Sequence, residues 1–94
     1  MNPNINEINK RIKSLMEVAN DRNGVIMFDW SNSRGGPCVL VREHVLLGVP
    51  VIALREGTDN FPWRLIANID GVQYVAYCDS KHLEGHDIQY KAGE

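Results

Sequence analysis

The apolar positions of this chain first recur at helical spacing and later gather in short continuous runs. Over residues 5–19, the charged side chains of Lys10, Arg11, Lys13 and Glu17 fall away from a single apolar face. That face is formed by Ile5, Ile8, Ile12, Leu15, Met16 and Ala19. This spacing predicts an amphipathic helix of about four turns.

Polar residues mark both ends of this helix. Asn4 is followed three residues later by Glu7, which is the spacing of a capping box, and Asn23-Gly24 supplies a stop signal. Beyond the stop, apolar runs at residues 25–28, 49–54 and 72–78 predict three strands. A short continuous apolar run is typical of a strand that is covered on both faces.

Two further helices are predicted between these strands. Pro37 suits the first turn of a helix over residues 38–47, and Pro62 opens a helix over residues 63–69. The order α-β-α-β-α-β predicts an α/β fold, a small three-layer Rossmann-like domain with a parallel sheet of about three strands and right-handed crossovers. A polar tail at residues 79–94 is expected to carry a turn or a short edge strand. Because a small sheet has exposed edges, pairing between subunits and hence a homo-oligomer are expected.

Length and composition limit the classes of protein and partner. A chain of 94 residues, 44% apolar and 23% charged, is typical of one soluble globular domain, residues 1–94. Its net charge of −2 disfavours non-specific binding of nucleic acid. The first residues contain no long apolar run, so neither a signal peptide nor a membrane span is expected, and the predicted location is the cytoplasm. Cys38 and Cys78 are expected to stay reduced there.

The loop before the second predicted helix is rich in hydrogen-bond donors. It contains the six residues Ser31, Asn32, Ser33, Arg34, Gly35 and Gly36. The unpaired N–H groups at a helix N-terminus attract anions, and glycines let the backbone approach a ligand closely. The loop therefore predicts a site for phosphate or another anion. The alternative is a tight connection that needs two glycines.

Glu43 is the most informative single residue of the second predicted helix. Its neighbours three and four positions away are all apolar: Val39, Leu40, Leu46 and Leu47. A carboxylate on such a face is costly to desolvate unless it has a partner. Either Glu43 pairs with Arg11 or Arg64, or it accepts hydrogen bonds from the hydroxyls of a ligand. His44 beside it is expected to be a solvated or core histidine.

A second polar loop, residues 55–61, is expected at the same rim of the sheet. Arg55 and Thr58 are its candidate ligand-binding residues, with a phosphate as the partner of Arg55 and an acidic side chain as the alternative. Phe61 and Trp63 could stack on a base. For Trp63 we favour packing in the core, because a small domain needs its large apolar residues inside.

Three segments together resemble a known nucleotide-donor site: residues 33–37, 39–43 and 48–53. The pattern is similar to the donor-binding motif of GT-B glycosyltransferases and of the sugar-nucleotide epimerases built on the same fold. In that family a glutamate on the helix binds the ribose of the donor, which implies this role for Glu43. The resemblance covers about residues 25–75. It does not extend to the second lobe that holds the acceptor, which favours binding over catalysis.

The sequence thus predicts binding, with sequestration as one use, of a nucleotide, sugar-nucleotide or other phosphorylated small molecule, and no cofactor. Two alternatives stay open: an enzyme of N-glycosidic or glycosyl-transfer chemistry that uses Glu43 within an oligomer, and an inhibitor or assembly factor that acts through an edge strand or the first helix. Cys78, His82 and His86 are zinc ligands by type. Their spacing matches no strong motif, so no metal is expected.

Overall fold

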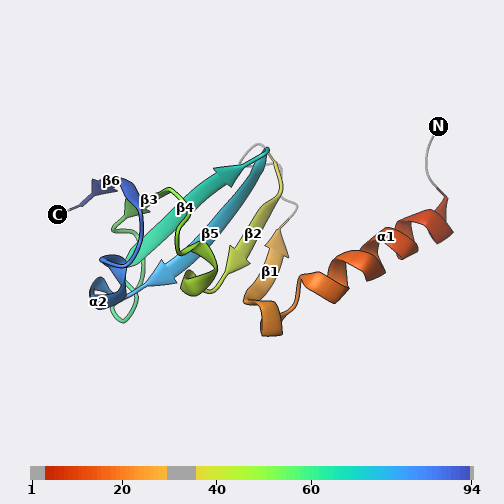
Figure 1. Cartoon of the computed structure of the whole chain (residues 1–94), viewed down its shortest axis with the longest axis horizontal. Helices are drawn as coiled ribbons and strands as arrows, with labels where there is room; N and C mark the ends of the chain where they lie inside the picture. Colours follow the sequence, from red (N-terminus) through yellow and green to blue (C-terminus); the bar gives the residue numbers. More distant parts are fainter. Residues whose placement is uncertain (1–3, 30–35, 94) are drawn as a thin grey trace.

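The structure is a computed structural model that describes residues 4–29 and 36–93. Within these ranges one sheet contains six strands in the order β1-β2-β5-β4-β3-β6. The strands are β1 (Val25–Asp29), β2 (Cys38–Val41), β3 (Val51–Leu54), β4 (Trp63–Ile69), β5 (Val72–Cys78) and β6 (Ile88–Ala92). The described helices are α1 (Ile5–Val18), α2 (Ser80–Leu83) and the 3₁₀ helices η1 (Asp21–Asn23) and η3 (Glu43–Leu46). Figure 1 shows α1 extending away from the sheet on the side of β1.

The predicted Rossmann-like fold is wrong, because the sheet is mixed and mostly antiparallel. Only β2 with β5 and β3 with β6 run parallel. The pairs β1–β2, β3–β4 and β4–β5 run antiparallel. No crossover helix covers a second face of the sheet in the described part of the chain, so the three-layer arrangement of parallel strands is absent there. The predicted strands at residues 25–28, 49–54 and 72–78 are present as β1, β3 and β5, and the tail carries α2 and the edge strand β6.

Two of the three predicted helices are strands. Residues 63–69 form β4, and residues 38–41 of the predicted helix 38–47 form β2, while η3 is the only helical turn left in that segment. Burial alternates along β4, with Trp63, Leu65 and Ala67 buried and the residues between them partly exposed. This is the period-two pattern of a strand with one face in the core. In β2, the β-branched Val39 and Val41 take the buried positions, which again favours a strand.

The turn between β4 and β5 explains why residues 63–69 pair as a strand. Asp70 and Gly71 both have positive φ, 50° and 84°, and they alone separate the two strands. A two-residue turn of this kind matches the twist of an antiparallel hairpin, and Asp-Gly is a favoured sequence for it. Seven residue pairs then align from Trp63 with Cys78 to Ile69 with Val72. Asp70-Gly71 is therefore a hairpin turn and not the end of a helix over residues 63–69.

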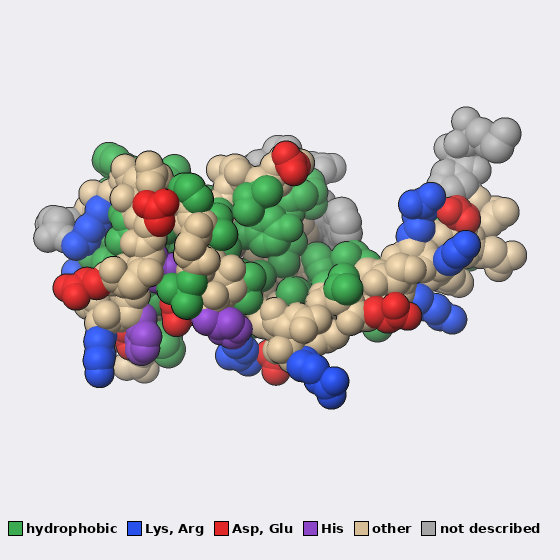
Figure 2. All heavy atoms as spheres, viewed as in Figure 1, with side chains coloured by type: hydrophobic (Ala, Val, Ile, Leu, Met, Phe, Trp, Pro, Cys, Tyr) green, Lys and Arg blue, Asp and Glu red, His purple; other side chains and the backbone are tan. Residues whose placement is uncertain are grey.

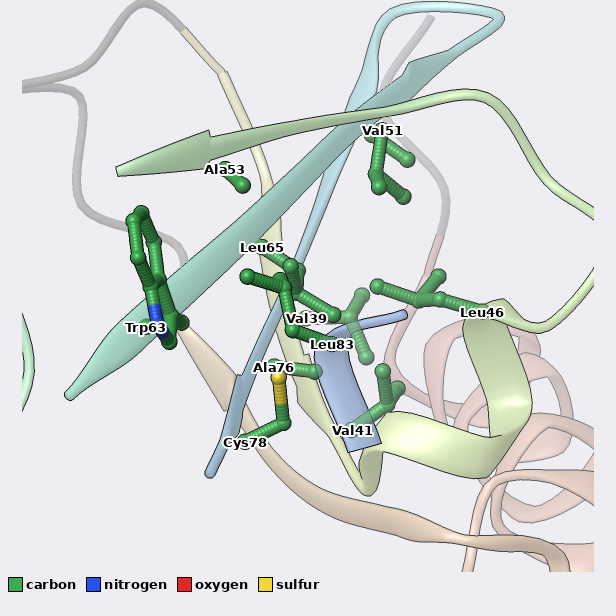
Figure 3. Close-up of a cluster of buried hydrophobic side chains, with 11 residues drawn as sticks. Val39, Val41, Leu46, Val51, Ala53, Trp63, Leu65, Ala76, Cys78 and Leu83 are labelled. Carbon is green, nitrogen blue, oxygen red and sulfur yellow. The ribbon is translucent and has the colours of Figure 1, made fainter. Parts of the chain in front are cut away.

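The hydrophobic core lies against one face of the sheet (Figure 3). Leu46 of η3 and Leu83 of α2 lie among the buried side chains from the strands and so cover this face. The core residues are Val39, Val41, Leu46, Val51, Ala53, Trp63, Leu65, Ala67, Ala76, Cys78 and Leu83.

The opposite face of the sheet carries a continuous row of apolar side chains. Every second residue of a strand points away from the core, and residues opposite each other on paired strands share a face. Cross-strand register aligns one such residue from each strand, and we call this row the apolar band: Met27, Leu40, Val75, Ile66, Ile52 and Tyr90. A more polar row adjoins it on the side of the β4–β5 turn, formed by Asp29, Cys38, Gln73 and Asn68. No helix of the described ranges packs on this face, since η3 and α2 lie in the core and α1 has no buried residue.

Candidate functional site

The described residues of the predicted anion site do not lie together. Gly36 lies beside the β4–β5 turn, because a Cβ added to it would come within 3.3 Å of the Gly71 carbonyl oxygen. Glu43 follows the other end of β2. The residue after the loop begins a strand, so the helix N-terminus that was to attract the anion is absent from residues 38–41. Ser31, Asn32, Ser33, Arg34 and Gly35 lie outside the described residues.

Arg55 and Thr58 have contacts within their own loop and the core. The Arg55 guanidinium lies over the ring of Trp63, 5.7 Å from its centroid. Thr58 closes a tight turn, because its Oγ1 accepts a hydrogen bond from the Phe61 N–H at 3.2 Å. Arg55 follows β3 and Glu43 follows β2, and two strands lie between these. The expected packing of Trp63 is confirmed, since its exposed fraction is 2% and its Nε1 donates to Ser80 Oγ at 3.2 Å.

Glu43 has a partner that the sequence did not indicate. Its Oε2 lies 2.5 Å from Nε2 of His86, whose side chain is fully buried. The other two candidates pair elsewhere: Arg11 binds Glu7 at 3.0 Å, and Arg64 binds Glu56 at 3.4 Å. The Glu43 side chain, 27% exposed, thus gives Nε2 of this buried histidine a partner, whereas Nδ1 of the same ring has no hydrogen-bond partner among the described residues. His44 is exposed.

A hollow of about 380 Å³ lies beside Glu43 at the end of β2. Its apolar walls include Ile26, Leu40, Phe61 and Tyr77, and Arg42, Glu43 and His44 form its polar part. Leu40 belongs to the apolar band and Tyr77 lies two residues along β5 from Val75, so the hollow adjoins the bare face of the sheet. The arrangement suits an apolar side chain of a partner better than a phosphate.

Cys78, His82 and His86 do not converge on a metal site. Cys78 is a buried core residue, His82 Nδ1 lies 2.7 Å from Asp79 Oδ1, and His86 pairs with Glu43. No group of three or more His, Cys, Asp or Glu side chains within residues 4–29 and 36–93 could hold a metal ion. Burial, together with the charges of Glu43 and Asp79, raises the pKa of the Cys78 thiol to about 11. The pKa of Asp79 is lowered because its carboxylate caps α2 and accepts hydrogen bonds from the His82 backbone and ring.

The helix α1 presents an unburied apolar stripe. The predicted helix and cap are confirmed, because α1 begins after Asn4, whose Oδ1 accepts from the Glu7 N–H at 2.9 Å. Five large residues of the stripe are 37% to 68% exposed: Ile5, Ile8, Ile12, Leu15 and Met16. Figure 2 shows the other side of α1, where charged side chains gather. The structure contains no helix, among the residues it describes, that is long and apolar enough to cross a bilayer.

A junction of hydrogen bonds and one ion pair connects α1 to the sheet. The Asn20 Nδ2 donates to the Glu17 carbonyl at 3.0 Å, and the Asn23 Nδ2 donates to the Val18 carbonyl at 2.6 Å. Gly24 has φ +85°, and its carbonyl accepts from the Arg42 N–H at 2.8 Å. The Arg42 side chain also pairs with Asp21 at 2.9 Å. These bonds tie the end of α1 through η1 to the end of β2.

Comparison of the chain with protein-family models, with curated proteins and with solved structures gave no match.

The apolar band and the exposure of α1 were not predicted, and one sequence signal could have indicated part of the band. Asp70-Gly71 stands between two runs rich in apolar residues, 63–69 and 72–78, which is the pattern of a hairpin with two distinct faces. Apolar residues at Ile66 and Val75 then fall on the face away from Trp63 and Cys78. The exposure of α1 had no sequence signal, because an apolar stripe has the same spacing whether or not it is buried.

Proposed function

We propose that this chain is a protein-interaction domain whose recognition element is the apolar stripe of α1. The observation that carries the proposal is a helix of 14 residues with no buried residue. Isolated helices of this length are marginal in water, and helices in proteins are stabilised mainly by packing of an amphipathic face. A partner that covers the stripe supplies the packing that the described part of this chain does not.

The size of the stripe is sufficient for recognition. Its five large residues together expose roughly the equivalent of two and a half side chains, and burial of each full side chain contributes about 1.5–3 kcal/mol. Covering the stripe is therefore worth about 4–8 kcal/mol before the costs of association. Ile5, Ile8, Ile12 and Leu15 have the spacing of anchors that dock a helix into a groove.

The alternatives receive less support. An interfacial membrane helix typically has many cations on its polar face and aromatic residues on its apolar face, whereas α1 has three cations, two anions and no aromatic residue. Nucleotide binding remains a prediction, but the helix that was to bind the phosphate is a strand. The enzyme hypothesis uses Glu43, whose carboxylate is paired with the buried His86.

Site-specific photocrosslinking in the producing cell tests the proposal. A diazirine amino acid is placed at Ile8 or Ile12 on the stripe, with Lys10 on the opposite side of α1 as the matched control. We expect strong protein adducts from both stripe positions and few from Lys10, with a second copy of the chain counted as a protein. Adducts with lipid alone, equal yields from all three positions, or no stripe adduct would contradict the proposal.

A further inference from the structure

We infer that the partner surface of α1 is the apolar band of a second copy of this chain, so that two chains exchange their helices reciprocally. This inference rests on the proposed function and names the partner. Both surfaces are apolar and occur in one chain, and no helix of the described residues packs on either of them, although Val75 in the middle of the band is only 4% exposed. The band is exposed where a helix would contact it, with Met27, Ile52 and Tyr90 between 39% and 60% exposed.

The dimensions of the two surfaces match. A helix of 14 residues is about 21 Å long at 1.5 Å per residue. A band that crosses six strands is about 24 Å long at about 4.8 Å per strand spacing. The hollow beside Leu40, with Ile26, Phe61 and Tyr77 in its walls, adds a recess for one large anchor of the stripe. The helix can therefore cover the band without leaving a long apolar remainder on either surface.

Folding α1 back onto the band of its own chain would cost the bonds of the junction. To fold back, the helix would have to break the bonds from Asn20 and Asn23 to the last turn of α1. It would also have to move η1 away from β2, where Asp21 pairs with Arg42. A second copy receives the stripe with all these bonds intact.

The buried area favours a reciprocal contact over a one-way contact. A fully exposed large aliphatic side chain offers on the order of 120 Å² of apolar area, so one stripe contributes about 300 Å² and one band, which exposes the equivalent of about two side chains, about 240 Å². One helix on one band buries about 540 Å², which is below the roughly 1,000 Å² expected of a stable interface. The reciprocal exchange buries about 1,080 Å², which passes that threshold. It also closes with two-fold symmetry and leaves neither surface exposed.

Sedimentation equilibrium of the purified chain tests the inference. We expect the wild type at twice the chain mass, and the chain mass for Ile12→Glu on the stripe and for Met27→Lys with Tyr90→Lys on the band. Lys10→Gln on the polar side of α1 and Gln89→Lys beside Tyr90 are the matched controls and should remain dimeric. Met27 and Tyr90 are more than half exposed, so their substitution leaves the core in place.

A second measurement does not depend on the folding of any band variant. Unlabelled chain carrying the photo-amino acid at Ile12 is mixed with ¹⁵N-labelled wild type, and the crosslinked peptides are identified by mass spectrometry. We expect intermolecular links to peptides that contain Met27, Leu40, Ile52 or Tyr90. A monomeric wild type, a band variant that stays dimeric, or links from Ile12 to α1 alone would overturn the inference. Each of these results leaves the protein adducts of the proposed function unaffected, so the two can fail separately.

Discussion

The replacement Gly24→Ala should destabilise the fold far more than an ordinary glycine substitution. Gly24 has φ +85°, and an L-residue in this conformation costs about 1–2 kcal/mol. A Cβ at this position would also lie 2.4 Å from Val45 Cγ2 and 3.2 Å from His44 Nε2. Forcing an extra carbon into such a space costs about 1–3 kcal/mol. The expected loss in the free energy of unfolding is therefore about 2–5 kcal/mol.

Gly48→Ala is the matched control for this experiment. Gly48 also has positive φ, +78°, but an added Cβ would meet no atom within 4 Å. It should therefore cost only the backbone term, about 1–2 kcal/mol. Urea unfolding followed by tryptophan fluorescence measures both losses at one protein concentration, and their difference isolates the collision with Val45.

A double variant sharpens the result. Because Val45→Ala removes the methyl group that an alanine at position 24 would meet, Gly24→Ala should cost less in that background, with a coupling of about 1–3 kcal/mol. If Gly24→Ala were no more destabilising than Gly48→Ala, or if Val45→Ala gave no relief, the packing of the junction against η3 would be refuted. The direction of α1 would then rest on the bonds of Asn20, Asn23 and Arg42 alone.

Two further predictions concern the buried groups near η3. The pKa of the Cys78 thiol rises from 9.0 to about 11 on folding, so the folded state favours the neutral thiol, and the free energy of unfolding falls by about 2–3 kcal/mol as the pH rises from below 9 to about 11. Urea unfolding at pH 8 and pH 10.5 should show this loss in the wild type and not in Cys78→Ala. An equal loss in both proteins would contradict the prediction. Glu43→Ala should lower the free energy of unfolding by about 1–3 kcal/mol, because Nε2 of the buried His86 loses its partner. Glu43→Gln should lower it less, and Glu84→Ala, at an exposed position, almost not at all. Equal free energies of unfolding for the three variants would argue against the pair.

Local signals in the sequence were sufficient where the chain itself supplies the partner. The spacing of Asn4 and Glu7 located the start of α1, because a cap involves residues only three positions apart. The run at residues 72–78 located β5 with both its ends. In contrast, residues 38–41 and 63–69 are short apolar segments whose pairing partners lie far along the chain. Helix and strand cannot be told apart from such runs alone.

The candidate site shows the same division between local and distant information. The sequence indicated that the Glu43 carboxylate needs a partner, because its neighbours are apolar. It did not indicate His86, which is 43 residues away and is separated from Glu43 along the chain by β3, the β4–β5 hairpin and α2. The apolar band is equally non-local, since it takes one residue from each of six strands.

The junction between α1 and β1 also fixes the rotational phase of the recognition helix. Each residue of an α-helix advances the side chains by about 100°, so one residue inserted between Leu15 and Asn20 would turn the stripe by more than a quarter of a circle relative to the sheet. The bonds from Asn20 and Asn23 hold that phase as firmly as they hold the direction. Recognition therefore depends on the length of this short connection as much as on the composition of the stripe. A chain that keeps every apolar residue of the stripe but gains or loses one residue in the connection would no longer present the stripe to its partner.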